Sequence, residues 1–238
     1  MALSSLYREP EAKRVDLDWP ALELHDVFRI YRSGPVETVA LRGVDLEVGR
    51  GEFVAIVGPS GCGKSTLLAL AAGLDRPSAG DVRVLGSSLA VLSEPELARY
   101  RARGVGVVFQ SGNLWETLSA AENVAISLRL AGRERPRWRA VEALQALGLG
   151  ARTDHRVAAL SGGEQQRVAI AAAVARGAPL VLADEPTGEL DSANERVVLE
   201  TLRGLPGEHE CAVVVVTHSE AVAAFADRTI ELRDGLVV

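Results

Sequence analysis

The chain has 238 residues, of which 47% are hydrophobic and 4% aromatic, and its formal net charge is −6. This length can bury a sizeable core, as one large domain or two small ones. The negative net charge argues against an extended surface for binding nucleic acid. The longest apolar stretch, residues 67–74, is much shorter than the roughly 18 residues that a membrane span needs.

The N-terminus and the cysteines indicate where the protein works. Residues 1–20 predict a mobile, charged extension, and its first residues lack the charged start and apolar core of a secretion signal. Cys62 and Cys211 lie far apart without C-x-x-C spacing, so both are expected to be reduced. We therefore expect a soluble, cytoplasmic protein.

The first third of the chain predicts antiparallel β structure around one strand–loop–helix unit. Apolar residues from 22 to 30 favour a strand, and two shorter strands, 38–41 and 44–48, are expected on either side of Gly43. The apolar run Phe53–Val57 is a further strand. A strand over 81–85 and an exposed helix over Glu94–Arg103 are expected later.

The segment after Phe53–Val57 has the spacing G-x-x-x-x-G-K-S of a phosphate-binding loop, and we call residues 58–66 the glycine loop. Its glycines let successive amides turn toward an anion, and the helix that begins near Lys64 adds the positive end of its dipole. Lys64 offers a charge to the outer phosphates, and the Ser65 hydroxyl suits Mg²⁺. The sequence therefore predicts a nucleoside triphosphate site. Its members are Gly58, Pro59, Ser60, Gly61, Cys62, Gly63, Lys64, Ser65 and Thr66.

The middle of the chain predicts a helical insertion. A buried-type strand over 105–109 ends at Gln110. Helices are expected over 119–130 and 137–147, where apolar residues recur three and four apart. Residues 149–160 have no regular pattern.

A second candidate anion site lies at the start of the next helix. Ser161 and Glu164 have the spacing of a capping box, which predicts that a helix starts there. Gly162 and Gly163 in its first turn each weaken a helix by about 1 kcal/mol relative to alanine. That cost is explained if this helix end meets another molecule closely and offers its amides to an anion. A simple cap beside a flexible joint is the alternative.

Two apolar strands deliver polar side chains at their carboxyl ends, where ligands bind in parallel sheets. After the strand over 179–183, Asp184 is placed to hold Mg²⁺, through water, and Glu185 to orient or deprotonate an attacking water. The alternative is that Asp–Glu–Pro merely ends a strand. After the strand over 212–216, His218 leaves the same edge and can reach a terminal phosphate, although a lone histidine at a strand end is more often structural. The remaining expected elements are helices over 192–202 and 220–225 and a strand over 229–232.

These motifs, in this order, resemble those of the nucleotide-binding subunits of ABC (ATP-binding cassette) transporters over residues 22–238. Besides the glycine loop, the resemblance includes Gln110, the signature segment 160–165, Glu185, Asp191 and His218. Tyr31 matches the aromatic residue that stacks on adenine in this family. Residues 107–110, 113–114, 122–124 and 186–188 look most like the branch of lipoprotein-release, macrolide-exporter and cell-division ATPases.

The resemblance implies an α/β P-loop NTPase fold of ABC type over residues 21–238, with an N-terminal antiparallel β subdomain and a helical subdomain over about 112–175. It implies an ATPase that binds ATP and Mg²⁺, with Ser65, Gln110 and Asp184 at the metal. Lys64 and His218 would stabilise the transition state, and Glu185 would direct water. Two copies would meet head to tail, so that each ATP lies between the glycine loop of one and residues 161–163 of the other, with Asp191 nearby.

The same resemblance implies integral membrane subunits as partners and no nucleic acid, with the chain attached to the inner face of the membrane. Export or lipoprotein extraction is the expected function. The alternative is a mechanotransmitting ATPase that controls extracytoplasmic enzymes without transport. The chain departs from the family pattern at Glu164, Ala172, Ser219 and Glu189. Of these, Glu189 beside Asp191 could alter the coupling of the two copies.

Overall fold

The computed structural model describes residues 19–110, 112–188 and 190–238. Glu189 and most of the expected N-terminal extension lie outside the described residues. Two residues of that extension, Trp19 and Pro20, are described. The Trp19 carbonyl accepts a hydrogen bond from Arg50 Nε at 3.1 Å, and its ring lies against Gly86, where an added Cβ would be 2.7 Å away. Trp19 is therefore packed on the domain.

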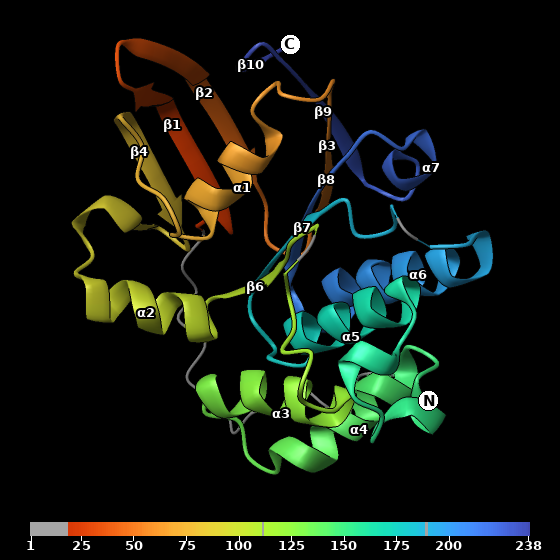
Figure 1. Cartoon of the computed structure of the whole chain (residues 1–238). Coiled ribbons are helices and arrows are strands. Elements are labelled where there is room, and N and C mark those ends of the chain that lie inside the picture. The colour runs from red at the N-terminus through yellow and green to blue at the C-terminus, as the bar shows by residue number, and fades with distance from the viewer. Residues whose placement is uncertain (1–18, 111, 189) are drawn as a thin grey trace.

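An antiparallel sheet forms the first layer, with the strand order β2-β1-β4-β5 (Figure 1). Its strands are β1 (Leu22–Ser33), β2 (Val36–Val48), β4 (Ala79–Val84) and β5 (Ser87–Ser88). The expected break at Gly43 is wrong, because β2 continues through it. Gly43 has a φ of 78° and is an extra residue between the pairs Val27–Val44 and Phe28–Arg42. Such a bulge bends and twists a strand without ending it.

The second sheet has the order β10-β9-β3-β8-β7-β6, and all its neighbours are parallel except β10 and β9. Its strands are β3 (Phe53–Val57), β6 (Val105–Val108), β7 (Leu180–Asp184), β8 (Ala212–Thr217), β9 (Arg228–Arg233) and β10 (Leu236–Val237). Strand β10, which pairs with β9 across a two-residue turn, was not predicted from the sequence. Both turn residues, Asp234 and Gly235, have positive φ, the geometry of a tight hairpin.

The helices agree with the expected positions, with two differences. They are α1 (Lys64–Ala71), α2 (Glu94–Arg103), α3 (Ala120–Leu130), α4 (Pro136–Ala146), α5 (Gly162–Val174), α6 (Ser192–His209) and α7 (Glu220–Ala223). The region expected to be irregular contains the 3-10 turns η3 (Gly150–Arg152) and η4 (Val157–Ala159), and another, η2 (Leu89–Val91), precedes α2. The end predicted for α6 is wrong, because the helix runs past Leu202 through Pro206, and Leu205 is buried against the core. In the described part of the chain, no helix has both the length and the apolarity to span a bilayer.

The parallel sheet separates two hydrophobic cores. Val213 and Val215 of β8 pack with residues of α3, α4, α5 and α6, whereas Val214 and Val216 pack with residues of α1 and the antiparallel sheet. This alternation follows from the two-residue period of a strand. In Figure 1, α3 and α4 lie at the end of the molecule opposite the antiparallel sheet, and α1 lies beside that sheet. Each face of the parallel sheet is therefore covered by its own layer.

Candidate active site

The strand register brings three of the predicted motifs to one edge of the parallel sheet. Val57, the last residue of β3, pairs with Thr217, the last residue of β8, and Asp184 at the end of β7 pairs with Val216. The glycine loop, Glu185 and His218 each follow directly from these residues. The carboxyl edge of the sheet therefore collects the loop, two carboxylates and an imidazole.

The glycine loop is packed so closely that two of its glycines have no room for a side chain. A Cβ on Gly58 would lie 2.1 Å from the Leu232 carbonyl oxygen, and one on Gly63 would lie 2.5 Å from the Ala40 carbonyl oxygen. Gly63 also has a φ of 110° and forms the N-cap of α1. The half-buried Lys64 folds back over the loop, where its Nζ donates to the carbonyl oxygen of Gly58 at 2.7 Å. A phosphate in the loop would meet this ammonium group and the amino end of α1.

Asp184 and Ser65 form an oxygen pair that suits a small divalent cation. The Ser65 hydroxyl and the charge of Lys64 both favour the ionised form of the Asp184 carboxylate. Burial is the largest influence, however, and together with the charge of Glu185 it raises the pKa of Asp184. Mg²⁺ binds oxygen ligands, commonly one or two from the protein with waters and phosphates. The residues therefore fit the metal that the resemblance implies.

The Glu185 carboxylate is held by two neighbours, Thr217 at the end of β8 and His218 directly after it. Its Oε2 accepts a hydrogen bond from the Thr217 hydroxyl at 2.9 Å, and its Oε1 lies 2.7 Å from His218 Nδ1. The Glu185 side chain is 14% exposed, whereas that of His218 is 76% exposed. The backbone of Glu185 has a φ of 47°, which is uncommon for a residue other than glycine. The carboxylate is thus fixed, and the imidazole is open to a ligand.

The signature segment starts α5 with the predicted capping box. Ser161 Oγ accepts from the Glu164 amide at 3.3 Å, and Glu164 Oε2 accepts from the Ser161 amide at 2.9 Å. Gly162 and Gly163 form the first turn, and Ser161 and Gly162 are exposed. Figure 1 shows α5 in the lower half of the molecule with α3 and α4, well separated from α1. Within one chain, the two candidate anion sites therefore lie apart.

The other predicted site residues lie around these motifs. Gln110 is exposed two residues beyond β6, whose last residue, Val108, pairs with Ala183. Asp191 is the N-cap of α6, and the hydrogen bond from the Asn194 amide is the largest of the influences that lower the pKa of Asp191. Tyr31 lies near the end of β1 and is 39% exposed.

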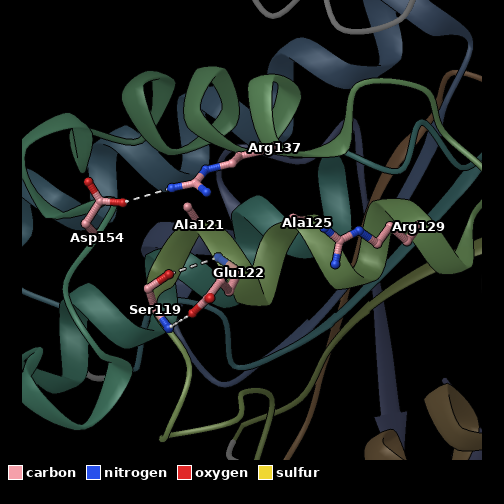
Figure 2. A pocket seen from close by; sticks show the side chains of 7 residues that line it. All are labelled: Ser119, Ala121, Glu122, Ala125, Arg129, Arg137 and Asp154. Carbon is pink, nitrogen blue, oxygen red and sulfur yellow. Dashed lines mark hydrogen bonds and ion pairs between the residues drawn. The ribbon is translucent and has the colours of Figure 1, made fainter.

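A pocket of about 290 Å³ between α3 and α4 contains none of the predicted site residues (Figure 2). Its lining residues are Ser119, Ala121, Glu122, Ala125, Arg129, Arg137 and Asp154. Ser119 and Glu122 form the capping box of α3, and Arg137 Nη2 lies 3.7 Å from Asp154 Oδ1. Most of its polar groups therefore have partners within the helical layer.

Thr217, Asp75 and Arg29, which contact predicted site residues, were not predicted from the sequence. Thr217 donates to Glu185, and Asp75 and Arg29 contact Tyr31. A sequence signal existed for Thr217 alone, since it immediately precedes His218 at the end of a buried strand. Asp75 and Arg29 are 46 residues apart and meet through tertiary structure.

Comparisons with known proteins agree with these observations. The family model described as "ABC transporter" matches residues 41–188. The lipoprotein-releasing system ATP-binding protein LolD of Chromohalobacter salexigens is 46% identical over 216 residues, which are 90% of this chain and 91% of the relative. The macrolide export ATP-binding/permease protein MacB of Azoarcus sp. is 46% identical over 232 residues, which are 96% of this chain. They are 35% of that relative, so the chain spans about a third of MacB.

Among solved structures, a dimeric, post-hydrolysis state of the ATP-binding cassette MJ0796 bound to ADP and Pi has a TM-score of 0.86 and 41% identity. The match covers 91% of this chain and 96% of that chain. The predicted ABC-type P-loop fold and the predicted branch are both confirmed. The chain belongs to the ABC transporter family and has the fold of its ATP-binding cassettes.

Proposed function

We propose that the chain is an ATP-hydrolysing subunit that drives separate membrane subunits. The observation that carries this proposal is the convergence of the glycine loop, Asp184, Glu185 and His218 at one edge of the parallel sheet. Lys64 binds the outer phosphates, and the amides of the loop surround them. Ser65 and Asp184 would hold Mg²⁺, with Gln110 as a further ligand. When bound, this ion neutralises phosphate charge as the bond to the terminal phosphate breaks.

Glu185 and His218 have different tasks in this proposal. Glu185 orients the attacking water and accepts its proton, and its fixed carboxylate supports this role because Thr217 holds Oε2 in place. The exposed His218 turns toward the terminal phosphate and stabilises its charge together with Lys64. The 2.7 Å contact between Glu185 and His218 supports the proposal that both groups act at one reacting centre.

We further propose that two copies assemble head to tail around two ATP molecules. The separation of α1 from α5 within one chain supports this, because a second copy can present Ser161, Gly162 and Gly163 to the first copy's glycine loop. The similar cassette MJ0796 is described as a dimer. Asp191 lies beside the shared nucleotide. Each bound ATP then adds contacts between the copies, and its hydrolysis removes them.

The proposed partners are integral membrane subunits, with this chain at the inner face of the membrane. Relatives named for lipoprotein release and macrolide export support export, or extraction of a lipoprotein or lipid, as the driven process. The helical layer of α3 and α4, together with Gln110, would transmit closure to the membrane subunits.

The test replaces Glu185 with glutamine, which keeps size and shape but cannot accept the proton. We expect Glu185→Gln to bind ATP while hydrolysis falls by about 10²- to 10⁴-fold. The purified variant should elute as a dimer in ATP and Mg²⁺ and as a monomer in ADP. Asp184→Asn is the matched control, because it also removes one negative charge but should weaken metal-dependent binding and give no dimer. Near-normal hydrolysis by Glu185→Gln would refute the assignment of the base.

A further inference from the structure

An exposed aromatic ring near the end of β1 is fixed by two charged side chains. The hydroxyl of Tyr31 donates to Asp75 Oδ2 at 3.0 Å, and the guanidinium carbon of Arg29 lies 4.4 Å from the ring centroid. Arg29 Nε donates to the same Asp75 oxygen at 2.8 Å. An exposed tyrosine normally samples several rotamers, so these contacts hold the ring in one orientation.

The backbone of Tyr31 is close in strand register to the loop that is proposed to bind phosphates. Tyr31 pairs with Thr38 of β2, and Thr38 is two residues from Ala40. The Ala40 carbonyl oxygen lies against Gly63, where an added Cβ would be 2.5 Å away. Because a strand rises by about 3.4 Å per residue, the Tyr31–Thr38 pair lies about 7 Å along β2 from this contact. A nucleotide with its phosphates in the loop can therefore extend its base toward the ring.

Asp75 links the two elements that would hold the two ends of a nucleotide. Its amide donates to the Ala69 carbonyl oxygen of α1 at 3.3 Å, and α1 begins with Lys64. Ser78, shortly after it, is joined to β1, because its amide donates to the Phe28 carbonyl oxygen at 2.7 Å. Its hydroxyl also accepts from the Ile30 amide at 3.0 Å. The Asp75 carboxylate is thus anchored to the phosphate side and reaches the aromatic side.

We propose that Asp75 and Arg29 are positioning residues that hold Tyr31 as a stacking platform for the nucleobase. Arg29 covers one face of the ring, and the base stacks on the other. The Asp75 carboxylate fixes the ring by accepting a hydrogen bond from the Tyr31 hydroxyl, and it also holds Arg29 in place. This inference rests on the proposed binding of ATP and deepens it, because it identifies which side chains prepare the base site.

The experiment compares binding of Mg–ATP with binding of Mg–tripolyphosphate, which lacks the base, to the full chain. Stacking of a base on an aromatic residue corresponds to about 5- to 150-fold in affinity, so Tyr31→Ala should weaken ATP binding by that factor. Asp75→Ala and Arg29→Met should each produce a part of this loss, and tripolyphosphate binding should stay within about twofold of wild type. Adding Asp75→Ala to Tyr31→Ala should cause no further loss, because the residue acts through the ring.

Arg32→Met is the matched control, because Arg32 forms an exposed ion pair with Glu37 in the same hairpin, at 2.9 Å. It should leave binding of both ligands unchanged. If Asp75→Ala does not fold, Tyr31→Phe removes the same hydrogen bond while keeping the ring, and should weaken ATP binding selectively.

Three results would overturn the inference while leaving the proposed ATP site intact. They are an equal loss for ATP and tripolyphosphate in the Asp75 or Arg29 variants, wild-type ATP affinity in those variants, and wild-type ATP affinity in Tyr31→Ala. A wild-type chain that binds neither ligand would refute the proposed function and this inference together.

Discussion

Replacing Thr217 with valine tests whether the position of the Glu185 carboxylate controls the rate of hydrolysis. Thr217 is 1% exposed at the end of β8, and its hydroxyl donates to Glu185 Oε2 at 2.9 Å. Valine has nearly the same shape, so Thr217→Val removes the hydroxyl without opening a cavity. The carboxylate would then be held by His218 alone, and we propose that the imidazole is needed at the phosphate during the reaction.

The size of the effect follows from this one hydrogen bond. A hydrogen bond to a charged group contributes about 1.5–3 kcal/mol. Because the Glu185 side chain is only 14% exposed, water compensates little for the lost hydrogen bond. Because 1.36 kcal/mol corresponds to a tenfold change in rate, kcat should fall by about 10- to 150-fold. The Ser219 amide also loses its acceptor, Thr217 Oγ1 at 3.0 Å, which should lower the free energy of unfolding by about 1 kcal/mol.

The assay is steady-state ATP hydrolysis by the full chain, with KM and kcat measured separately. Thr217→Val should lower kcat with little change in KM, because Thr217 lies outside the glycine loop. Thr217→Ser restores the hydroxyl and should recover most of the rate. The reasoning is refuted if a folded Thr217→Val enzyme turns over at the wild-type rate, or if the serine variant is as slow as the valine variant.

Two further predictions concern the proposed interface between copies and the loss of stability caused by the charge of Asp184 in the proposed metal site. Ser161→Arg should leave ATP binding by one monomer unchanged but prevent closed dimers in size-exclusion chromatography, whereas full activity of strictly monomeric protein would contradict the head-to-tail arrangement. Folding raises the pKa of Asp184 above 3.8. In the pH range just above 3.8, the native state therefore binds more protons than the unfolded state. The free energy of unfolding consequently falls as the pH rises and this carboxylate ionises. Nucleotide-free Asp184→Asn should therefore melt at a higher temperature than wild type at pH 7, with a difference that shrinks as the pH falls toward 3.8; a lower melting temperature at pH 7 would contradict this.

The parallel sheet was predictable because its strands are apolar on both faces. Phe53–Val57 and the runs in β7 and β8 are buried almost completely, so their sequences show continuous hydrophobic stretches rather than alternation. The carboxyl edge, with Asp184, Glu185 and His218, follows from that arrangement.

Other features depend on information that a local pattern does not carry. The extension of α6 past Leu202 overrides the weak helix propensity around Pro206, because Leu205 is buried by tertiary packing. By contrast, the Asp234–Gly235 turn is a strong hairpin signal that the sequence analysis overlooked.

The contacts of the candidate site were the hardest to foresee. Arg29 and Tyr31 are two residues apart on a strand whose register shifts between Arg29 and Ile30. Asp75 lies on a loop that is 46 residues from Arg29 in the sequence. The sequence identifies Glu185 as a candidate base, but it does not say that Thr217 will hold it.

The two cores on opposite faces of the parallel sheet have a consequence for how such a chain can diverge. Alternate residues of β8 belong to different cores, so a substitution at Val213 or Val215 changes the packing of the helical layer, and one at Val214 or Val216 changes the packing beneath α1. Effects of mutations that share no packing partners are close to additive. The packing of the helical layer can therefore change while the core under the glycine loop stays the same.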